Sequence, residues 1–171
     1  MRFITVCPIL SPRLPDAFLS FKKLSAHSLF YPSGCPADGV HLRVHAIDRD
    51  KYFIEKLSDE TKGTNVESIE GDMTKLDQLT EHSADLIYVS TVIHALPKQK
   101  LIPFLKEAKR VLKPNALLAI VEIEKKETPF GPAMENRYSP EELMQKVPMV
   151  PVKTVMVGEH FYMQVFMNVE N

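Results

Sequence analysis

An aspartate stands where a short apolar stretch of the chain ends. The stretch LRVHAIDRD runs from Leu42 to Asp50, and its apolar part predicts a β-strand that stops at Asp48. An acid at the carboxyl end of a strand lies at the edge where open α/β sheets bind ligands, and nucleotide-binding folds use it to hold ribose hydroxyls. The alternative is an acid that caps the helix expected to begin at Asp50. Asp48 is the first candidate for a binding residue.

Further polar residues follow two later strands. Gly71 and Asp72 come directly after a strand predicted in NVESIEGD, and Ser90 and Thr91 end a strand in ADLIYVS. Each of these positions fits either a ligand contact or an ordinary turn. His94 lies shortly beyond, and a histidine, with an ordinary pKa of about 6.5, suits general base catalysis as well as simple packing.

Two glutamates alternate on a later strand, ALLAIVEIE. Glu122 and Glu124 are close enough to the strand end to reach the same edge, but a solvated strand end is the expectation for both. No metal site is predicted at four of the histidines, which are His41, His45, His82 and His160.

Composition limits the classes of function. The chain has 171 residues, enough for one domain with a sizeable core. Its net charge of −1 provides no basic field for nucleic acid or an anionic membrane, so neither is an expected partner. Two cysteines, Cys7 and Cys35, predict free thiols, and no apolar run approaches the roughly 20 residues of a membrane span. A cytoplasmic location is expected.

From about residue 40 onward, strand patterns alternate with helix patterns. The clearest helix is KQKLIPFLKEAKRVLKPN, in which one apolar stripe recurs at helical spacing and consists of Leu101, Phe104, Leu105, Ala108, Val111 and Leu112. The charges of KEAKR predict its solvated face. A helix is also expected over 50–63, ended by Gly63, and another begins at a capping box formed by Ser139 and Glu142.

This order of elements predicts an α/β fold. Alternating strands and helices give a mainly parallel sheet with helices on both faces. The runs VKTVMV and FYMQVFMNV flank Gly158 and predict an antiparallel β-hairpin at the carboxyl end. The expected division is an atypical segment over 1–40 and one domain over 41–171. In the first segment FITVCPIL is a candidate strand, although Pro8 argues against a central place in a sheet.

Five stretches, in this order, resemble the class I S-adenosylmethionine-dependent methyltransferases. Within that class the likeness is to the small methyltransferase-domain type related to ubiquinone/menaquinone-biosynthesis enzymes. The likeness covers about three quarters of the chain, from Leu42 to Asn171, and the stretches are VHAIDRD, VESIEGDMTKL, ADLIYVSTVIHAL, LKEAKRVLKPNALLAIVEIEKKE and VKTVMVGEHFYMQVF. It implies a Rossmann-like fold, S-adenosylmethionine as cofactor and a small molecule as methyl acceptor.

The resemblance also implies which residues contact the adenosine half of the cofactor. Asp48 matches the acid that accepts hydrogen bonds from both ribose hydroxyls, and Arg49 would flank the adenine. Asp72, after Gly71, matches the residue that contacts the adenine amino group. Met73 would pack on or near the adenine ring.

Other residues are implied for the rest of the active site. Ser90 and Thr91 would lie beneath the methionine part of the cofactor. His94 matches a histidine that often faces the mouth of the active site, and it is the candidate catalytic residue.

One motif of these enzymes is absent. Their first strand ends in an acid-x-G-x-G-x-G loop, and nothing in residues 1–41 matches it. The segment GCPADG ends only nine residues before Asp48, and FITVCPIL contains no glycine. A methyltransferase-like protein that has lost cofactor binding is therefore the alternative. A nicotinamide-binding domain is weaker, since it needs G-x-G-x-x-G as well. A sheet lacking its first strand would leave two central edges unpaired, which would favour a homo-oligomer.

Overall fold

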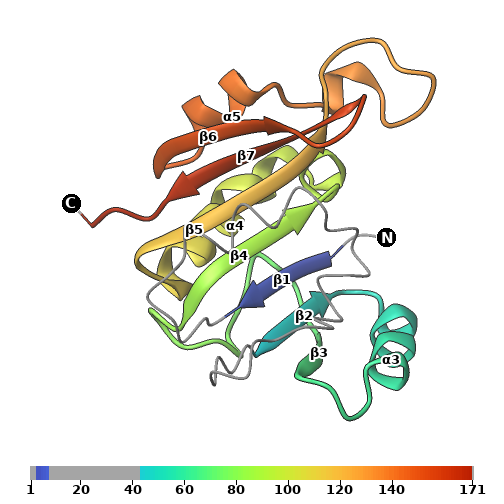
Figure 1. Cartoon of the computed structure of the whole chain (residues 1–171), viewed down its shortest axis with the longest axis vertical. Helices are drawn as coiled ribbons and strands as arrows, with labels where there is room; N and C mark the ends of the chain where they lie inside the picture. The colour runs from blue at the N-terminus through green and yellow to red at the C-terminus, as the bar shows by residue number, and fades with distance from the viewer. Residues whose placement is uncertain (1–2, 8–42, 171) are drawn as a thin grey trace.

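The computed structural model describes residues 3–7 and 43–170 (Figure 1). These residues form a seven-stranded sheet with the order β3-β2-β1-β4-β5-β7-β6. The expectations for GCPADG, Cys35 and His41 lie outside the described residues. The strands and helices, in chain order, are β1 Phe3–Cys7, β2 Val44–Asp48, α3 Lys51–Glu60, β3 Val66–Glu70, β4 Ala84–Ser90, α4 Lys98–Val111, β5 Leu112–Ile123, α5 Pro140–Lys146, β6 Val150–Met156 and β7 Phe161–Met167.

The first β-α-β unit consists of β2, α3 and β3, and its two strands are parallel. The carboxylate of Asp50 accepts a hydrogen bond from the Tyr52 N–H and caps α3. Ile54 and Leu57 are buried, as the helical pattern predicts. The helix ends at Glu60, before Gly63, whose φ of +81° is left-handed and turns the chain toward β3.

The second unit consists of β4, α4 and β5, again with parallel strands. All six residues of the predicted stripe on this helix are buried, which confirms the helix and its inward face. β5 begins at Leu112, directly after α4 and four residues earlier than the run ALLAIVEIE suggests. The register between β4 and β5 shifts between Ala84 and Leu86, so β5 is irregular opposite this point. Asn115, in the irregular part of β5, has a φ of +62°.

The carboxyl-terminal hairpin is confirmed. β6 and β7 are antiparallel, and β7 pairs antiparallel with β5. Before the hairpin, Ser139 and Glu142 form the predicted capping box: the Ser139 hydroxyl accepts from the Glu142 N–H, and the Glu142 carboxylate accepts from the Ser139 N–H. β6 is an edge strand that carries Pro151 and Lys153, residues that discourage pairing with another strand.

β1 lies in the middle of the sheet and runs against both neighbours. Thr5 is paired with Ala46 of β2 and with Tyr88 of β4, in each case antiparallel. The prediction that this segment has no central place in a sheet is wrong, because β1, Phe3–Cys7, lies between β2 and β4; Pro8 is outside the described residues. The two central edges expected to be open are also paired, so the reason given for a homo-oligomer does not hold; the oligomeric state stays a prediction.

The fold class is confirmed, with one difference in strand direction. β2, β3, β4, β5 and β6 share a direction, and β1 and β7 are reversed. The sheet is therefore mixed: β2 and β3 are parallel, as are β4 and β5, and the other four pairs of neighbouring strands are antiparallel. The division of the chain at residue 40 stays a prediction, although the described strand β1 belongs to the same sheet as the rest.

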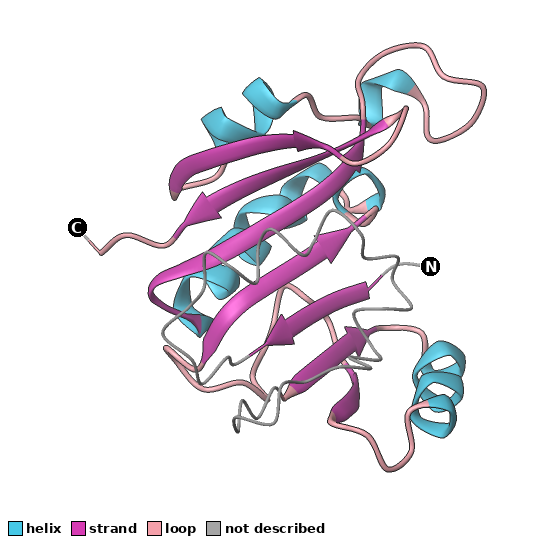
Figure 2. Cartoon of the chain, in the orientation of Figure 1, coloured by secondary structure: helices cyan, strands magenta, loops and turns pink. Residues whose placement is uncertain are grey.

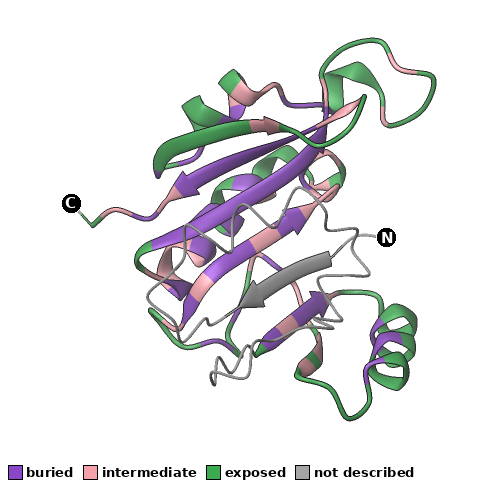
Figure 3. Cartoon of the chain, viewed as in Figure 1, coloured by how far each residue is buried: buried purple, intermediate pink, exposed green. Residues whose placement is uncertain are grey.

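Helices lie on both faces of the sheet (Figure 2). α4 and α5 pack on one face, where Phe104 and Leu143 join a cluster with Ile87 and Ile120 of the central strands. α3 packs on the other face through Leu57 and Ala46. Figure 3 shows that burial is greatest along β5 and β7. The packed core thus supports the strand ends that carry the candidate residues.

Candidate functional site

The carboxyl ends of β2, β3, β4 and β5 lie along one edge of the sheet, which we call the carboxyl edge. At this edge Asp48 is paired with Glu70, the last residue of β3, and Ser90 is paired with Val121 of β5. The candidate residues that end or directly follow β2, β3 and β4 therefore lie at this edge. This is the place where open α/β sheets bind ligands.

The Asp48 carboxylate is held in place by the turn that follows β2. Its Oδ1 accepts a hydrogen bond of 2.8 Å from the Asp50 N–H. Among the described residues no other hydrogen bond to this carboxylate is recorded, which leaves Oδ2 available to a ligand. The alternative that Asp48 caps α3 is wrong, because Asp50 is the N-cap. A half-buried acid with one fixed oxygen is well suited to bind a pair of hydroxyls.

Gly71 joins the ends of β2 and β3. Its N–H donates to the backbone oxygen of Asp48 over 2.9 Å. A Cβ added at Gly71 would lie 3.3 Å from the Ile47 side chain and 3.3 Å from the Gln78 amide. This close approach keeps the ends of β2 and β3 together. Asp72, the residue after Gly71, therefore follows directly on the contact with the Asp48 backbone.

The Asp72 carboxylate is anchored from two sides. Its Oδ1 accepts from the Thr74 N–H at 2.9 Å and from the Thr74 hydroxyl at 2.8 Å, and its Oδ2 accepts from the Lys100 ammonium of α4 at 2.9 Å. Burial alone would raise the pKa of Asp72, but these hydrogen bonds and the Lys100 charge bring it down to about 2. Asp72 is therefore an anion at neutral pH, and Oδ2 retains a lone pair for a further donor.

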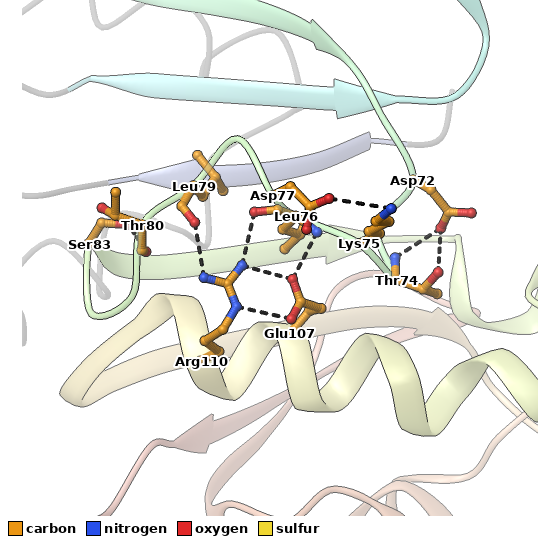
Figure 4. Close-up of polar contacts among 10 residues, drawn as sticks. All are labelled: Asp72, Thr74, Lys75, Leu76, Asp77, Leu79, Thr80, Ser83, Glu107 and Arg110. Carbon is orange, nitrogen blue, oxygen red and sulfur yellow. Dashed lines mark hydrogen bonds and ion pairs between the residues drawn. The ribbon is translucent and has the colours of Figure 1, made fainter.

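Two charged residues of α4 hold the loop between β3 and β4 (Figure 4), and we call Glu107 and Arg110 the loop clamp. The Leu76 N–H donates to Glu107 Oε2 at 2.9 Å, and Arg110 donates to the carbonyl oxygens of Leu76 and Leu79 at 3.0 and 3.1 Å. Arg110 Nε donates to Glu107 Oε1 at 3.0 Å. The loop that presents Asp72 is thus fixed to α4 at several points.

The loop clamp corrects the sequence interpretation of KEAKR as a solvated face. The side chains of Glu107 and Arg110 are only 21% and 28% exposed. Their hydrogen bond lowers the pKa of Glu107 and raises that of Arg110, against the opposing effect of burial. One signal was available in the sequence: Glu107 stands beside Ala108 and therefore borders the apolar stripe.

The low pKa of Asp72 predicts a dependence of stability on acid. Because the folded pKa of about 2 lies below the ordinary 3.8, the Asp72 anion stabilises the fold fully above about pH 4 and loses this effect as the pH falls through 2. We expect Asp72→Asn to lower the urea midpoint at pH 7, and the difference from wild type to shrink toward pH 2. Asp77→Asn, an exposed acid of the same loop, is the control. An equal difference at every pH would contradict the role of the charge.

Ser90 and Thr91 make a sharp turn at the end of β4. Thr91 has a φ of +54°, in the left-handed region that a β-branched side chain rarely adopts. Its N–H donates to the Val121 oxygen at 2.9 Å and its hydroxyl to the Ser90 oxygen at 2.8 Å, so the conformation is held by neighbouring backbone. Strained backbone of this kind is typical of functional sites.

His94 lies in the 3₁₀ helix Ile93–Ala95 and contacts a buried acid. Its Nδ1 is 2.5 Å from Oε2 of Glu122, whose side chain is 1% exposed. The Ile93 N–H also donates to Glu122 Oε1 at 2.7 Å. The expectation of a solvated strand end is wrong for Glu122: its side chain enters the face covered by α4 and α5, where Tyr162 is paired with it.

The last two candidates differ in exposure. Arg49 is exposed, in the turn between β2 and α3. Met73 is 6% exposed and belongs to the cluster that contains Ile47 and Leu76. The contacts expected of both with an adenine ring stay predictions.

Comparison with known proteins gives the family. A family model described as a methyltransferase domain matches residues 31–120, which are 90 of the 171 residues. The chain belongs to this methyltransferase domain family. The class I S-adenosylmethionine-dependent methyltransferase resemblance is thereby confirmed. The closer relation to ubiquinone/menaquinone-biosynthesis enzymes stays a prediction.

Solved methyltransferase structures share the fold. A SAM dependent methyltransferase from Aquifex aeolicus is 28% identical with a TM-score of 0.66, over 74% of this chain and 69% of that one. A putative type 11 methyltransferase from Sulfolobus solfataricus is 18% identical with a TM-score of 0.62, over 74% of this chain and 71% of that one. The N-methyltransferase NodS from Bradyrhizobium japonicum in complex with S-adenosyl-l-homocysteine is 17% identical with a TM-score of 0.60, over 75% of this chain and 67% of that one. The last two likenesses concern the fold alone. No match was found among curated proteins.

The carboxyl edge of this methyltransferase domain fits the adenosine half of S-adenosylmethionine, the cofactor of its class. Asp48 offers a fixed carboxylate whose Oδ2 has no partner among the described residues. Asp72, in the next loop, offers a second fixed carboxylate, whose Oδ2 keeps a lone pair beside Lys100. The part of the edge that would border the methionine half of the cofactor is built differently. Because β1 runs antiparallel, Cys7 lies beside Leu86 at the opposite edge of the sheet, and Phe3 lies beside Ser90. The carboxyl end of β1 therefore does not supply a glycine-rich loop here.

Over residues 3–7 and 43–170, no group of three histidine, cysteine or acidic side chains is placed to hold a metal ion. Within the same residues, no helix has the length and apolar character needed to cross a membrane.

Proposed function

We propose that this chain transfers a methyl group from S-adenosylmethionine to a small-molecule acceptor at the carboxyl edge of its sheet. The observation that carries the proposal is the Asp48 carboxylate, fixed at the end of β2 by the Asp50 N–H with one oxygen free, in a chain of the methyltransferase domain family. An acid so placed is how nucleotide-binding α/β folds hold ribose hydroxyls.

Each candidate residue has a role in this proposal. Asp48 accepts hydrogen bonds from the ribose hydroxyls, and Asp72 accepts one from the adenine amino group. Gly71 allows the two strand ends to approach, while Arg49 and Met73 border the adenine. The pairing of Asp72 with Lys100 and the loop clamp support this assignment, because they hold the loop rigid before any ligand binds.

We assign the transfer of the methyl group to the carboxyl end of β4. Ser90 and Thr91 border the methionine part of the cofactor, and His94 faces the acceptor. When bound, S-adenosylmethionine supplies a methyl group on a positively charged sulfur. The protein contributes mainly position, because a fixed alignment of donor and acceptor lowers the barrier strongly.

The proposed function is tested by calorimetric titration of the whole chain with S-adenosylmethionine and with S-adenosylhomocysteine. We expect both to bind with a dissociation constant in the micromolar range. No heat of binding at millimolar ligand would overturn the proposal.

The same titration decides the second candidate, a methyltransferase-like protein that has lost its cofactor. The reversed β1 favours this candidate, because no described residue replaces the missing glycine-rich loop. The free oxygen of Asp48 and the preformed Asp72 loop favour the enzyme. Micromolar binding would leave the enzyme as the only one of the two that fits.

A further inference from the structure

Glu122 is a buried acid whose only described partners belong to the segment that carries His94. Its side chain is 1% exposed, and it accepts hydrogen bonds at Oε1 from the Ile93 N–H at 2.7 Å and the His94 N–H at 3.4 Å. Its Oε2 lies 2.5 Å from His94 Nδ1. Burying a carboxylate is costly unless donors surround it. All of these donors come from two consecutive residues.

The surroundings of Glu122 contain tyrosines that do not neutralise it. The Tyr162 hydroxyl donates to the Tyr138 backbone oxygen at 2.6 Å. Burial, and then the negative charge of Glu122, raise the pKa of Tyr162; burial, Glu142 and Glu122 raise that of Tyr138. Both tyrosines therefore stay neutral. The Lys125 ammonium is paired with Glu142 at 2.5 Å.

The hydrogen bonds decide which ring nitrogen of His94 carries the proton. An ionised carboxylate accepts hydrogen bonds and has no proton to donate. For an ionised Glu122, Oε2 can bind Nδ1 only if Nδ1 carries the hydrogen, and the neutral ring then has its lone pair on Nε2. No partner for Nε2 is recorded among the described residues. The His94 side chain is 11% exposed and follows the end of β4, so Nε2 is left as the ring's free acceptor at the carboxyl edge.

We infer that Glu122 is a positioning residue that holds His94 with Nε2 as a proton acceptor, and that the methyl acceptor therefore carries an O–H or N–H proton that must be removed. This inference rests on the proposed function. The acceptor's proton passes to Nε2, and its freed electron pair forms the bond to the methyl carbon. The pair of the broken carbon–sulfur bond stays on sulfur, giving S-adenosylhomocysteine, and the imidazolium returns its proton to water.

The tautomer is tested without cofactor or acceptor. Long-range proton–nitrogen NMR spectra of protein labelled with ¹⁵N-histidine, recorded at about pH 9, above the ordinary pKa of histidine, distinguish the two tautomers. His94→Asn identifies the His94 signal. We expect the Nδ1–H form in wild type. In Glu122→Gln, where one amide oxygen must serve both Ile93 and His94, we expect the Nε2–H form to gain population. An Nε2–H ring in wild type would overturn the inference.

The role in catalysis is tested with a phenol and a primary amine as acceptor probes, measured by release of S-adenosylhomocysteine. We expect Glu122→Gln to lower kcat by about 100-fold, at the low end of what a general base contributes, with an unchanged dissociation constant for S-adenosylmethionine. Glu124→Gln, directly after the end of the same strand, is the matched control. Wild-type kcat in Glu122→Gln, or turnover of a thiol probe but of neither the phenol nor the amine, would overturn the inference.

The two proposals fail in different ways. Absence of S-adenosylmethionine binding in wild type contradicts the proposed function. Binding with the wrong tautomer contradicts only the role of Glu122. If Glu122→Gln lowers the melting temperature strongly, Glu122→Asp is used instead, since it keeps the charge but shortens the reach to His94; it should also shift the tautomer population.

Discussion

Asp48→Ala is expected to weaken binding of S-adenosylmethionine by at least about 100-fold. A hydrogen bond to a charged group contributes about 1.5–3 kcal/mol, and the carboxylate would accept two from the ribose. Each 1.4 kcal/mol changes affinity about tenfold, so losing both bonds weakens binding by more than about 100-fold. No other described side chain replaces the carboxylate at the end of β2, where its Oδ1 is already held by the Asp50 N–H.

Two further variants define the cause of that loss. Asp48→Asn keeps the shape but has one acceptor oxygen in place of two, so we expect an intermediate loss. Asp59→Ala removes an exposed acid of α3 and should bind as wild type does. Calorimetric titration measures all three, with circular dichroism to establish that each is folded. Wild-type affinity in Asp48→Ala would show that the ribose is held elsewhere.

Arg110→Met is expected to lower the free energy of unfolding by about 2–4 kcal/mol. The change leaves the carbonyl oxygens of Leu76 and Leu79 without their donor, and leaves Glu107 partly buried without its counter-ion. For a chain of this size the melting temperature should fall by roughly 5–15 °C. The loop that carries Asp72 then loses its attachment to α4, so the affinity for S-adenosylmethionine should fall as well.

Urea unfolding and the same calorimetric titration measure these effects. Lys106→Met is the matched control, because it removes an exposed cation from the same helix. Combining Arg110→Met with Glu107→Gln gives a double-mutant cycle, and we expect the two changes to be clearly less than additive, since each disrupts the same bonds. Additive effects would mean that the two residues stabilise the loop independently.

The reversed direction of β1 explains how the sheet closes without the usual loop. β1 fills the place between β2 and β4, so both strands gain their hydrogen bonds. Its amino end, at Phe3, lies at the carboxyl edge beside Ser90. The sheet therefore keeps the strand ends that hold the adenosine half while changing what borders the methionine half.

Local patterns in the sequence were enough for most of the fold. The stripe on α4 and the capping box of Ser139 and Glu142 depend on residues three or four apart, so they are visible in a single helix. The strand that ends at Asp48 and the carboxyl-terminal hairpin follow from apolar runs and turn residues in the same way. Because parallel strands end at one edge, the position of Asp48 at that edge was also predictable.

Only the tertiary structure decided the contacts between distant segments. Glu122 contacts the His94 ring although the two residues are 28 positions apart in the sequence, and Glu107 accepts a hydrogen bond from Leu76, 31 positions away. Nothing in the local pattern indicates that Glu122 is buried, and for Glu107 the pattern shows only that it borders the apolar stripe. The burial of both acids depends on which strand or loop packs against them. The direction of β1 is of the same kind: an apolar run of five residues pairs equally well in either direction, and only its neighbours select one.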